Sequence, residues 1–214
     1  ALTSLLSAGY RLSKRKVQLL LSDAFGVSML LGSVSQLEQT TSAVVAPAVE
    51  AAKQYIQEQE ATNIDETGWK DKGIKYWAWV FCSPLVSFFW IAQSRSSKVL
   101  EEILGETYGG PIVSDFFSAY VKYANKLQQF CLAHLIRDIK FLTTLPDKND
   151  KDFGDALLMQ FKKLFHFWHQ RDKIPKELFD RRMLRIKKRV LALAEQDDLP
   201  AKSVTLAKRL RKHG

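Results

Sequence analysis

The stretch from Asn63 to Ala92 reads NIDETGWKDKGIKYWAWVFCSPLVSFFWIA and decides the fold class. It contains three segments rich in β-branched and aromatic residues, separated by short turns at Gly73 and Pro84. Such segments are typical of consecutive strands joined by tight turns. We therefore predict three strands over residues 64–69, 74–82 and 85–91.

Helix and strand patterns alternate after these strands. Ser96 or Ser97 is suited to cap a helix that Gly105 ends. We then predict a strand over 112–114, a helix over 116–124, a strand over 127–131 and a helix over 134–142. The order βββαβαβα predicts a mixed α/β sheet, in which crossover helices make the later strands parallel.

Residues 1–60 have helical patterns. Ser13 can cap one helix, Gly26 provides a tight turn after it, and we expect another helix from Pro47 to about Glu60. A helix-turn-helix DNA reader is one interpretation, but no Lys or Arg occurs from residue 17 to residue 52. A structural or dimerising helical bundle is the other. The basic side chains that remain for DNA-backbone contacts are Arg11, Lys14, Arg15 and Lys16.

The formal charge of the 214 residues is +9, which favours a polyanionic partner such as nucleic acid. Residues 1–136 hold 12 basic and 12 acidic residues, whereas residues 137–214 hold 20 basic and 11 acidic ones. This shift, with a loop pattern near Pro146, divides the chain into parts 1–60, 61–145 and 146–214. The two cysteines exclude a disulfide scaffold.

The basic third part is expected to be helical throughout. Its apolar positions repeat at spacings of 4, 3, 4 and 3 over Phe179, Met183, Ile186, Val190 and Leu193. We expect this seam to pack against Phe161 and Trp168 or against another helix, rather than to form a long coiled coil. The other faces carry Arg181, Arg182, Arg185, Lys187, Lys188 and Arg189. They form either a solvated surface or a contact with the DNA backbone, and their density favours the DNA contact.

Two aspartates are candidate catalytic and metal-binding residues. Asp65 interrupts an apolar strand, and Asp115 directly follows the strand 112–114. A carboxylate within or at the end of a central strand costs folding free energy unless a partner such as a divalent cation compensates its charge. Magnesium prefers oxygen ligands of this kind. The alternative is that Asp115 caps the next helix and Asp65 lies in an exposed turn.

A second group of polar residues surrounds Cys131. His134 and Arg137 follow it at three-residue intervals, so they lie one turn apart at the start of a helix. A zinc site would also need His166 and His169, which lie far along the chain. The favoured interpretation makes Cys131 a buried strand residue instead, with Arg137 either functional or paired with an acid.

The segments 65–69, 76–80, 113–120 and 131–138 resemble, in type, order and approximate spacing, the central domain of the insertion-sequence 66 family of bacterial DDE transposases. The resemblance implies an RNase H-like fold with a basic helical insertion. It also implies metal-dependent polynucleotidyl transfer, with Asp65 bridging two Mg²⁺ (or Mn²⁺) ions about 4 Å apart and Asp115 holding one. His134 and Arg137 would face the active site or a DNA phosphate.

The family's third acid is a Glu within an Asn-rich segment that this sequence does not contain. Glu177 and Glu195 look like solvated surface charges, so we expect the third acid beyond Gly214 and a chain of low activity by itself. The resemblance implies double-stranded DNA as partner, a homo-oligomer, and a cytoplasmic, nucleoid-associated bacterial protein without a membrane span. The alternatives are an RNase H-like nuclease or resolvase, and a DNA-binding remnant without catalysis.

Overall fold

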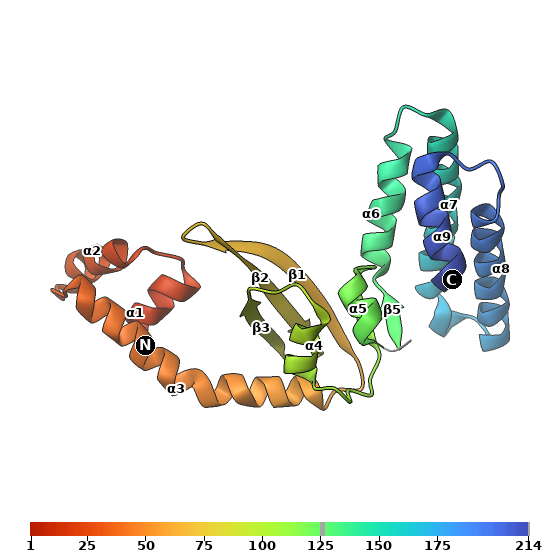
Figure 1. Ribbon diagram of the computed structural model, residues 1–214. Coiled ribbons are helices and arrows are strands. Elements are labelled where there is room, and N and C mark those ends of the chain that lie inside the picture. Colours follow the sequence, from red (N-terminus) through yellow and green to blue (C-terminus); the bar gives the residue numbers. More distant parts are fainter. Residues whose placement is uncertain (125–126, 214) are drawn as a thin grey trace. The chain divides into compact units, whose positions relative to one another are not determined.

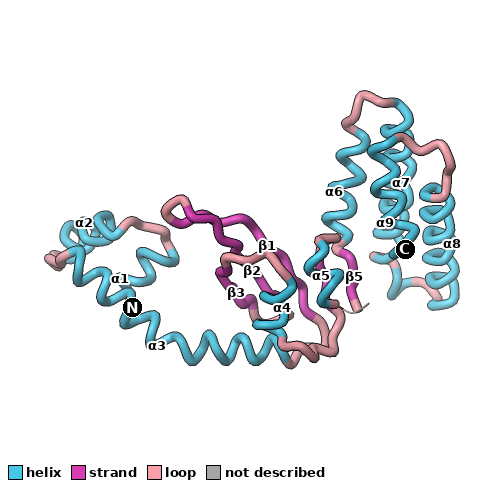
Figure 2. Tube along the Cα trace, in the orientation of Figure 1, coloured by secondary structure: helices cyan, strands magenta, loops and turns pink. Residues whose placement is uncertain are grey.

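The computed structural model describes residues 1–124 and 127–213, and the chain forms two compact units, 1–128 and 129–214 (Figure 1). The first unit combines helices with a sheet, and the second is built from helices, as the colours of Figure 2 show. The division at residues 60 and 145 that the sequence favours stays a prediction. None of the described helices is long and apolar enough to cross a membrane.

The first unit begins with helices α1 (Leu2–Ser4), α2 (Lys14–Phe25) and α3 (Leu31–Gln57), with a π-helical turn over Leu5–Gly9. Two sequence predictions are confirmed here. The hydroxyl of Ser13 accepts a hydrogen bond from the backbone N–H of Lys16, at 3.3 Å, and so caps α2. Gly26 ends α2 with a φ of 65°, which glycine adopts without strain.

The prediction that a helix begins at Pro47 is wrong, because α3 starts at Leu31 and continues through this proline. Proline removes one helical hydrogen bond, and the carbonyl it frees needs another partner. Residues 42–51 are all exposed, so water can satisfy that carbonyl. The first half of α3 contacts α1 and α2, and its last turns pack near β3 and α4 (Figure 1).

The five predicted strands are all present, as β1 (Thr62–Asp71), β2 (Ile74–Cys82), β3 (Ser87–Ala92), β4 (Ile112–Ser114) and β5 (Gln128–Phe130). Their order in the sheet is β3-β2-β1-β4-β5. The first three strands pair antiparallel, whereas β1 and β4 pair parallel. Strand β3 starts two residues later than predicted, because Ser83 and Val86 bond to each other in a turn.

Helices α4 (Ser97–Leu104) and α5 (Ser118–Tyr123) contribute to one core with the sheet and the end of α3. Its buried members include Ile64, Trp79, Phe81, Phe88, Leu100, Ile103, Ile112 and Tyr120. Along β3, Phe88 lies in this core while its neighbours Phe89 and Ile91 are exposed. The sheet therefore has one face in the core and one face that is open within this unit.

The second unit contains α6 (Leu132–Thr143), α7 (Lys148–Trp168), α8 (Lys176–Ala194) and α9 (Ala201–His213), with a short 3₁₀ turn over Arg171–Lys173. Neighbouring helices of this unit contact one another. On the seam of α8, Ile186 is buried and the ring of Phe179 lies 6.2 Å from that of Trp168. The predicted contact of the seam with Trp168 is confirmed.

Cys131 is not the buried strand residue that the sequence favoured. It is half-buried and lies between β5 and α6, where it occupies the N-cap position of α6 with a φ of −65° and a ψ of 113°. The helix begins at Leu132, two residues before the predicted start, and the strand therefore ends before Cys131. A residue at an N-cap keeps extended backbone angles, which explains why the pattern looked like a strand.

Candidate functional site

Asp65 lies inside strand β1 on the face opposite the core. Thr62 and Ile64 are buried, while Asn63 and Asp65 are exposed, as expected when side chains alternate along a strand. One carboxylate oxygen of Asp65 (Oδ1) accepts a hydrogen bond of 2.9 Å from the backbone N–H of Glu66. The alternative that Asp65 lies in an exposed turn is wrong, since the paired strand continues to Asp71.

Asp115 directly follows strand β4 and is half-buried. Its Oδ1 accepts a hydrogen bond of 2.8 Å from the backbone N–H of Phe117, the N-cap residue of α5. The carboxylate therefore fixes the turn that leads into α5, close to the capping role considered from the sequence. Its second oxygen is not needed for this bond, so the capping contact and a ligand role are compatible.

The parallel pairing of β1 and β4 relates the two aspartates. Thr62 pairs with Ile112 and Asn63 pairs with Val113. Asp65 lies two residues beyond Asn63, and Asp115 lies two residues beyond Val113. Each aspartate thus lies two residues beyond the last residue pair that β1 and β4 share, and neighbouring strands are spaced by about 4.8 Å.

Glu66 is the residue of this region that the sequence reasoning did not single out. Its side chain is 1% exposed and forms an ion pair with Arg95, at 2.5 Å between Nη2 and Oε1. The hydroxyl of Tyr120 donates a hydrogen bond to its other oxygen. The guanidinium of Arg95 lies 3.8 Å from the ring centre of Phe117 and 4.5 Å from that of Trp77.

Burial raises the pKa of Glu66 to about 7 by disfavouring its charged form. The hydrogen bond and charge of Arg95 oppose this effect, while the negative charges of Asp115 and Asp65 raise the pKa further. Both aspartates therefore act electrostatically on the same buried carboxyl group. Asp65 lies on the open face of the sheet, and Glu66 lies on the core face of the same strand.

The sequence did contain a signal for Glu66. Period-two alternation along β1 places Glu66 on the same face as Thr62 and Ile64, the core face. A carboxylate on a core face requires a partner. That partner was not identifiable from sequence, because Arg95 and Tyr120 lie 29 and 54 residues further along the chain.

His134 and Arg137 both lie on α6 in the second unit, His134 half-buried and Arg137 exposed. A site shared with Asp65 and Asp115 stays a prediction. Across residues 1–124 and 127–213, no group of three or more His, Cys, Asp or Glu side chains could hold a metal ion, so the zinc alternative gains no support. His166 instead contacts Gln170, and His169 contacts the ring of Phe165.

The six basic residues predicted to contact DNA all lie on α8. Five are exposed, and the sixth, Arg182, is half-buried with its guanidinium 4.6 Å from the ring centre of Phe167. The apolar seam packs inward, so most of these cations are directed to solvent. The exposed members are Arg181, Arg185, Lys187, Lys188 and Arg189.

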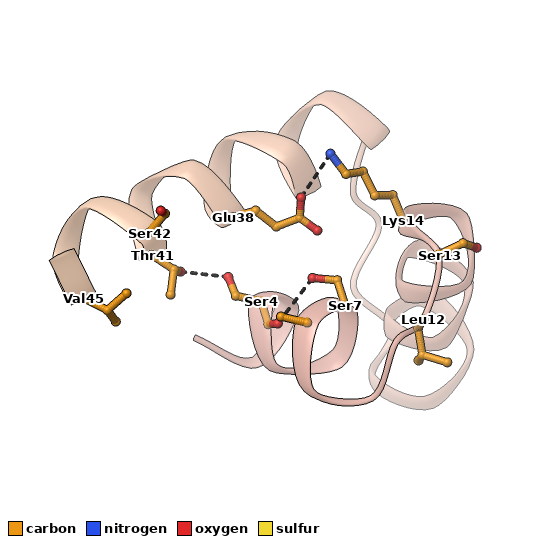
Figure 3. A pocket seen from close by; sticks show the side chains of 10 residues that line it. Ser4, Ser7, Leu12, Ser13, Lys14, Glu38, Thr41, Ser42 and Val45 are labelled. Carbon is orange, nitrogen blue, oxygen red and sulfur yellow. Dashed lines mark hydrogen bonds and ion pairs between the residues drawn. The ribbon is translucent and has the colours of Figure 1, made fainter. Parts of the chain in front are cut away.

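A groove lies between the N-terminal helical turns and α3 (Figure 3). Its side chains bond to each other, as Ser4 Oγ bonds to Thr41 Oγ1 at 2.8 Å and Lys14 pairs with Glu38 at 3.0 Å. Hydrogen bonds from Ser7 and Lys14 hold the pKa of Glu38 below its usual value. These mutual contacts connect the N-terminal helices to one another, and they give the groove a structural role.

The features described so far define an α/β protein with two carboxylates at neighbouring strand positions and a strongly basic helical unit. The family model of the transposase IS66 family matches residues 13–213. The chain therefore belongs to the transposase IS66 family, a family of nucleic-acid-processing enzymes whose activity implies DNA binding. A comparison with curated proteins finds no match.

Proposed function

We propose that Asp65 and Asp115 are two of the acidic ligands of a DDE transposase active site, which cleaves and joins DNA strands. The observation that carries this proposal is their equivalent placement beyond paired residues of the parallel strands β1 and β4. Both aspartates raise the pKa of Glu66, which supports a position of both near this carboxyl group. Membership of the transposase family supplies the substrate class, DNA.

The fold assignment that accompanies this proposal is an RNase H-like core over residues 61–145. The sheet order β3-β2-β1-β4-β5 supports it, with three antiparallel strands first and a parallel fourth strand next to β1. Residues 1–60 form a helical N-terminal region, and residues 146–214 form a basic helical insertion in this scheme. The helical content of both segments agrees with it.

The two aspartates are a partial ligand set for Mg²⁺ or Mn²⁺. Magnesium sites commonly use one or two carboxylates and complete the shell with water and substrate phosphates, so Asp65 and Asp115 fit this pattern. Two bound ions would activate water or a 3′-hydroxyl and stabilise the leaving oxygen at a DNA phosphate. We assign no third acid among the described residues, since Glu177 and Glu195 are exposed in the second unit.

The basic face of α8 is proposed to bind the DNA backbone. Its exposed cations can neutralise phosphates, which gives binding that is independent of sequence and weakens as salt increases. Exposed Arg137 on α6 is suited to the same kind of phosphate contact, with His134 one turn before it. Assembly into a homo-oligomer on DNA completes the proposal.

Binding of Mn²⁺ to the 214-residue chain, measured by titration calorimetry, tests the site. We expect Asp65→Asn and Asp115→Asn to weaken binding by about a hundredfold or more, because each removes a ligand. Asp71→Asn removes the same charge from an exposed position at the end of β1 and should bind Mn²⁺ like the unchanged chain. Equal binding by all four proteins, or metal-dependent DNA nicking that survives Asp65→Asn, would overturn the proposal.

A further inference from the structure

A chain of hydrogen bonds, an ion pair and ring contacts links Glu66 to both aspartates. Its backbone N–H donates to Oδ1 of Asp65, at 2.9 Å. Its side chain, on the opposite side of the strand, holds Arg95 through an ion pair and accepts the hydroxyl hydrogen bond of Tyr120. One residue therefore orients the first aspartate directly and is linked to two other elements through its carboxylate.

The second half of the network leads to Asp115. The guanidinium of Arg95 lies over Phe117, at 3.8 Å from the ring centre, and the ring of Tyr120 meets Phe117 edge-on at 6.2 Å. The backbone N–H of Phe117 in turn binds Oδ1 of Asp115. Glu66 thus fixes two side chains that hold Phe117, and Phe117 holds the Asp115 carboxylate.

We infer that Glu66 is a positioning residue which, through Arg95, Tyr120 and Phe117, orients the Asp115 carboxylate relative to Asp65. This inference rests on the proposed function, since it concerns the same two ligands. Partners behind metal ligands fix ligand geometry, and their loss typically lowers metal affinity tenfold to a hundredfold. The network needs the charge of Glu66 to retain Arg95, because an ion pair with a planar guanidinium is directional.

The test measures Mn²⁺ affinity at pH 8 by titration calorimetry on the full chain, with folding monitored by circular dichroism and thermal unfolding. Glu66→Gln removes the charge that holds Arg95, and Arg95→Lys keeps a charge but loses the guanidinium that lies over Phe117. We expect each variant to remain folded and to bind Mn²⁺ about tenfold more weakly. If Glu66→Gln fails to fold, Arg95→Lys decides the question, since Arg95 is partly exposed.

Tyr108→Phe is the matched control. The hydroxyl of Tyr108 also bonds to strand β1, at 2.9 Å from Thr62 Oγ1, and it donates its own hydrogen bond to the carbonyl of Gln59. We expect it to lower thermal stability without changing Mn²⁺ affinity, which separates positioning from a general loss of stability.

Two outcomes would overturn the inference. Unchanged affinity in both Glu66→Gln and Arg95→Lys would show that Glu66 does not position the ligands, while Asp65→Asn still abolishes binding. An equal loss of affinity in Tyr108→Phe would show a general effect of stability. If Asp65→Asn itself binds Mn²⁺ normally, the proposed function fails, and this result is distinct from the other two.

Discussion

The two units of the chain use charge in opposite ways. In the first unit the charges balance, and a decisive one, Glu66, is buried and bonded to Arg95 and Tyr120. In the second unit the basic residues are in excess, and most of those on α8 are exposed. Net charge therefore indicates where a polyanion can bind, whereas a region of balanced charge can hold the residues suited to chemistry.

The largest expected effect concerns the exposed charges. Replacing Arg181, Arg185 and Lys188 of α8 together with Gln should weaken binding to double-stranded DNA about a hundredfold at low salt. It should also reduce the slope of log affinity against log salt by about 2 to 3, since each phosphate contact contributes about 0.9. Fluorescence anisotropy at several salt concentrations measures both quantities.

The matched control removes three exposed charges from the first unit instead, as Lys70→Gln, Lys98→Gln and Lys122→Gln. We expect this variant to retain nearly all of its DNA affinity. An equal loss in both variants would mean that total charge, rather than the α8 surface, determines binding, and the contrast between the units would disappear.

The buried carboxyl group of Glu66 should make the free energy of unfolding depend on pH. A carboxyl whose pKa rises from 4.5 to about 7 on folding stabilises the fold fully below pH 4.5, and this contribution is lost as the pH rises through 7. Relative to Glu66→Gln, the unchanged chain should therefore lose on the order of 2 kcal/mol between pH 4.5 and pH 8. Urea unfolding of both proteins across this range measures the difference, and a constant difference would contradict the burial effect.

A smaller effect is expected at a buried carboxylate of the second unit. Asp150 is 4% exposed and accepts hydrogen bonds from the backbone N–H and the hydroxyl of Ser203, at 3.0 and 2.5 Å. Ser203→Ala removes the hydroxyl bond to a buried charge and should cost about 1.5 kcal/mol of unfolding free energy. Urea unfolding measures it, and no change would mean that the N–H bond alone satisfies Asp150.

The smallest effect is expected at an exposed cap. Ser13→Ala removes the hydroxyl that caps α2 and should cost about 0.5–1 kcal/mol. The same serine-to-alanine change is thus measured at a buried and at an exposed helix start. A larger loss at Ser13 than at Ser203 would reverse the expected order of buried and exposed polar contacts.

The sequence predicted local structure well where short-range signals dominate. Alternating aromatic and β-branched residues located the strands, and Ser13 and Gly26 located the ends of α2, because these signals act within a few residues. Prediction was wrong at Pro47, since a proline in an exposed helix can be tolerated when water satisfies the freed carbonyl. It was also wrong at Cys131, where a helix start kept extended backbone angles.

In the candidate site, too, some features could be predicted from the sequence and others could not. The sequence by itself identified Asp65 and Asp115 and the basic face of α8, because charge and position along the chain are visible in the order of residues. Only the tertiary structure showed that each aspartate follows the paired segment of β1 and β4 by two residues, and revealed the buried Glu66 with its partners. The physical reason is that register, burial and ion pairing join residues 29 to 54 positions apart, and such contacts exist only once the sheet and its helices have packed.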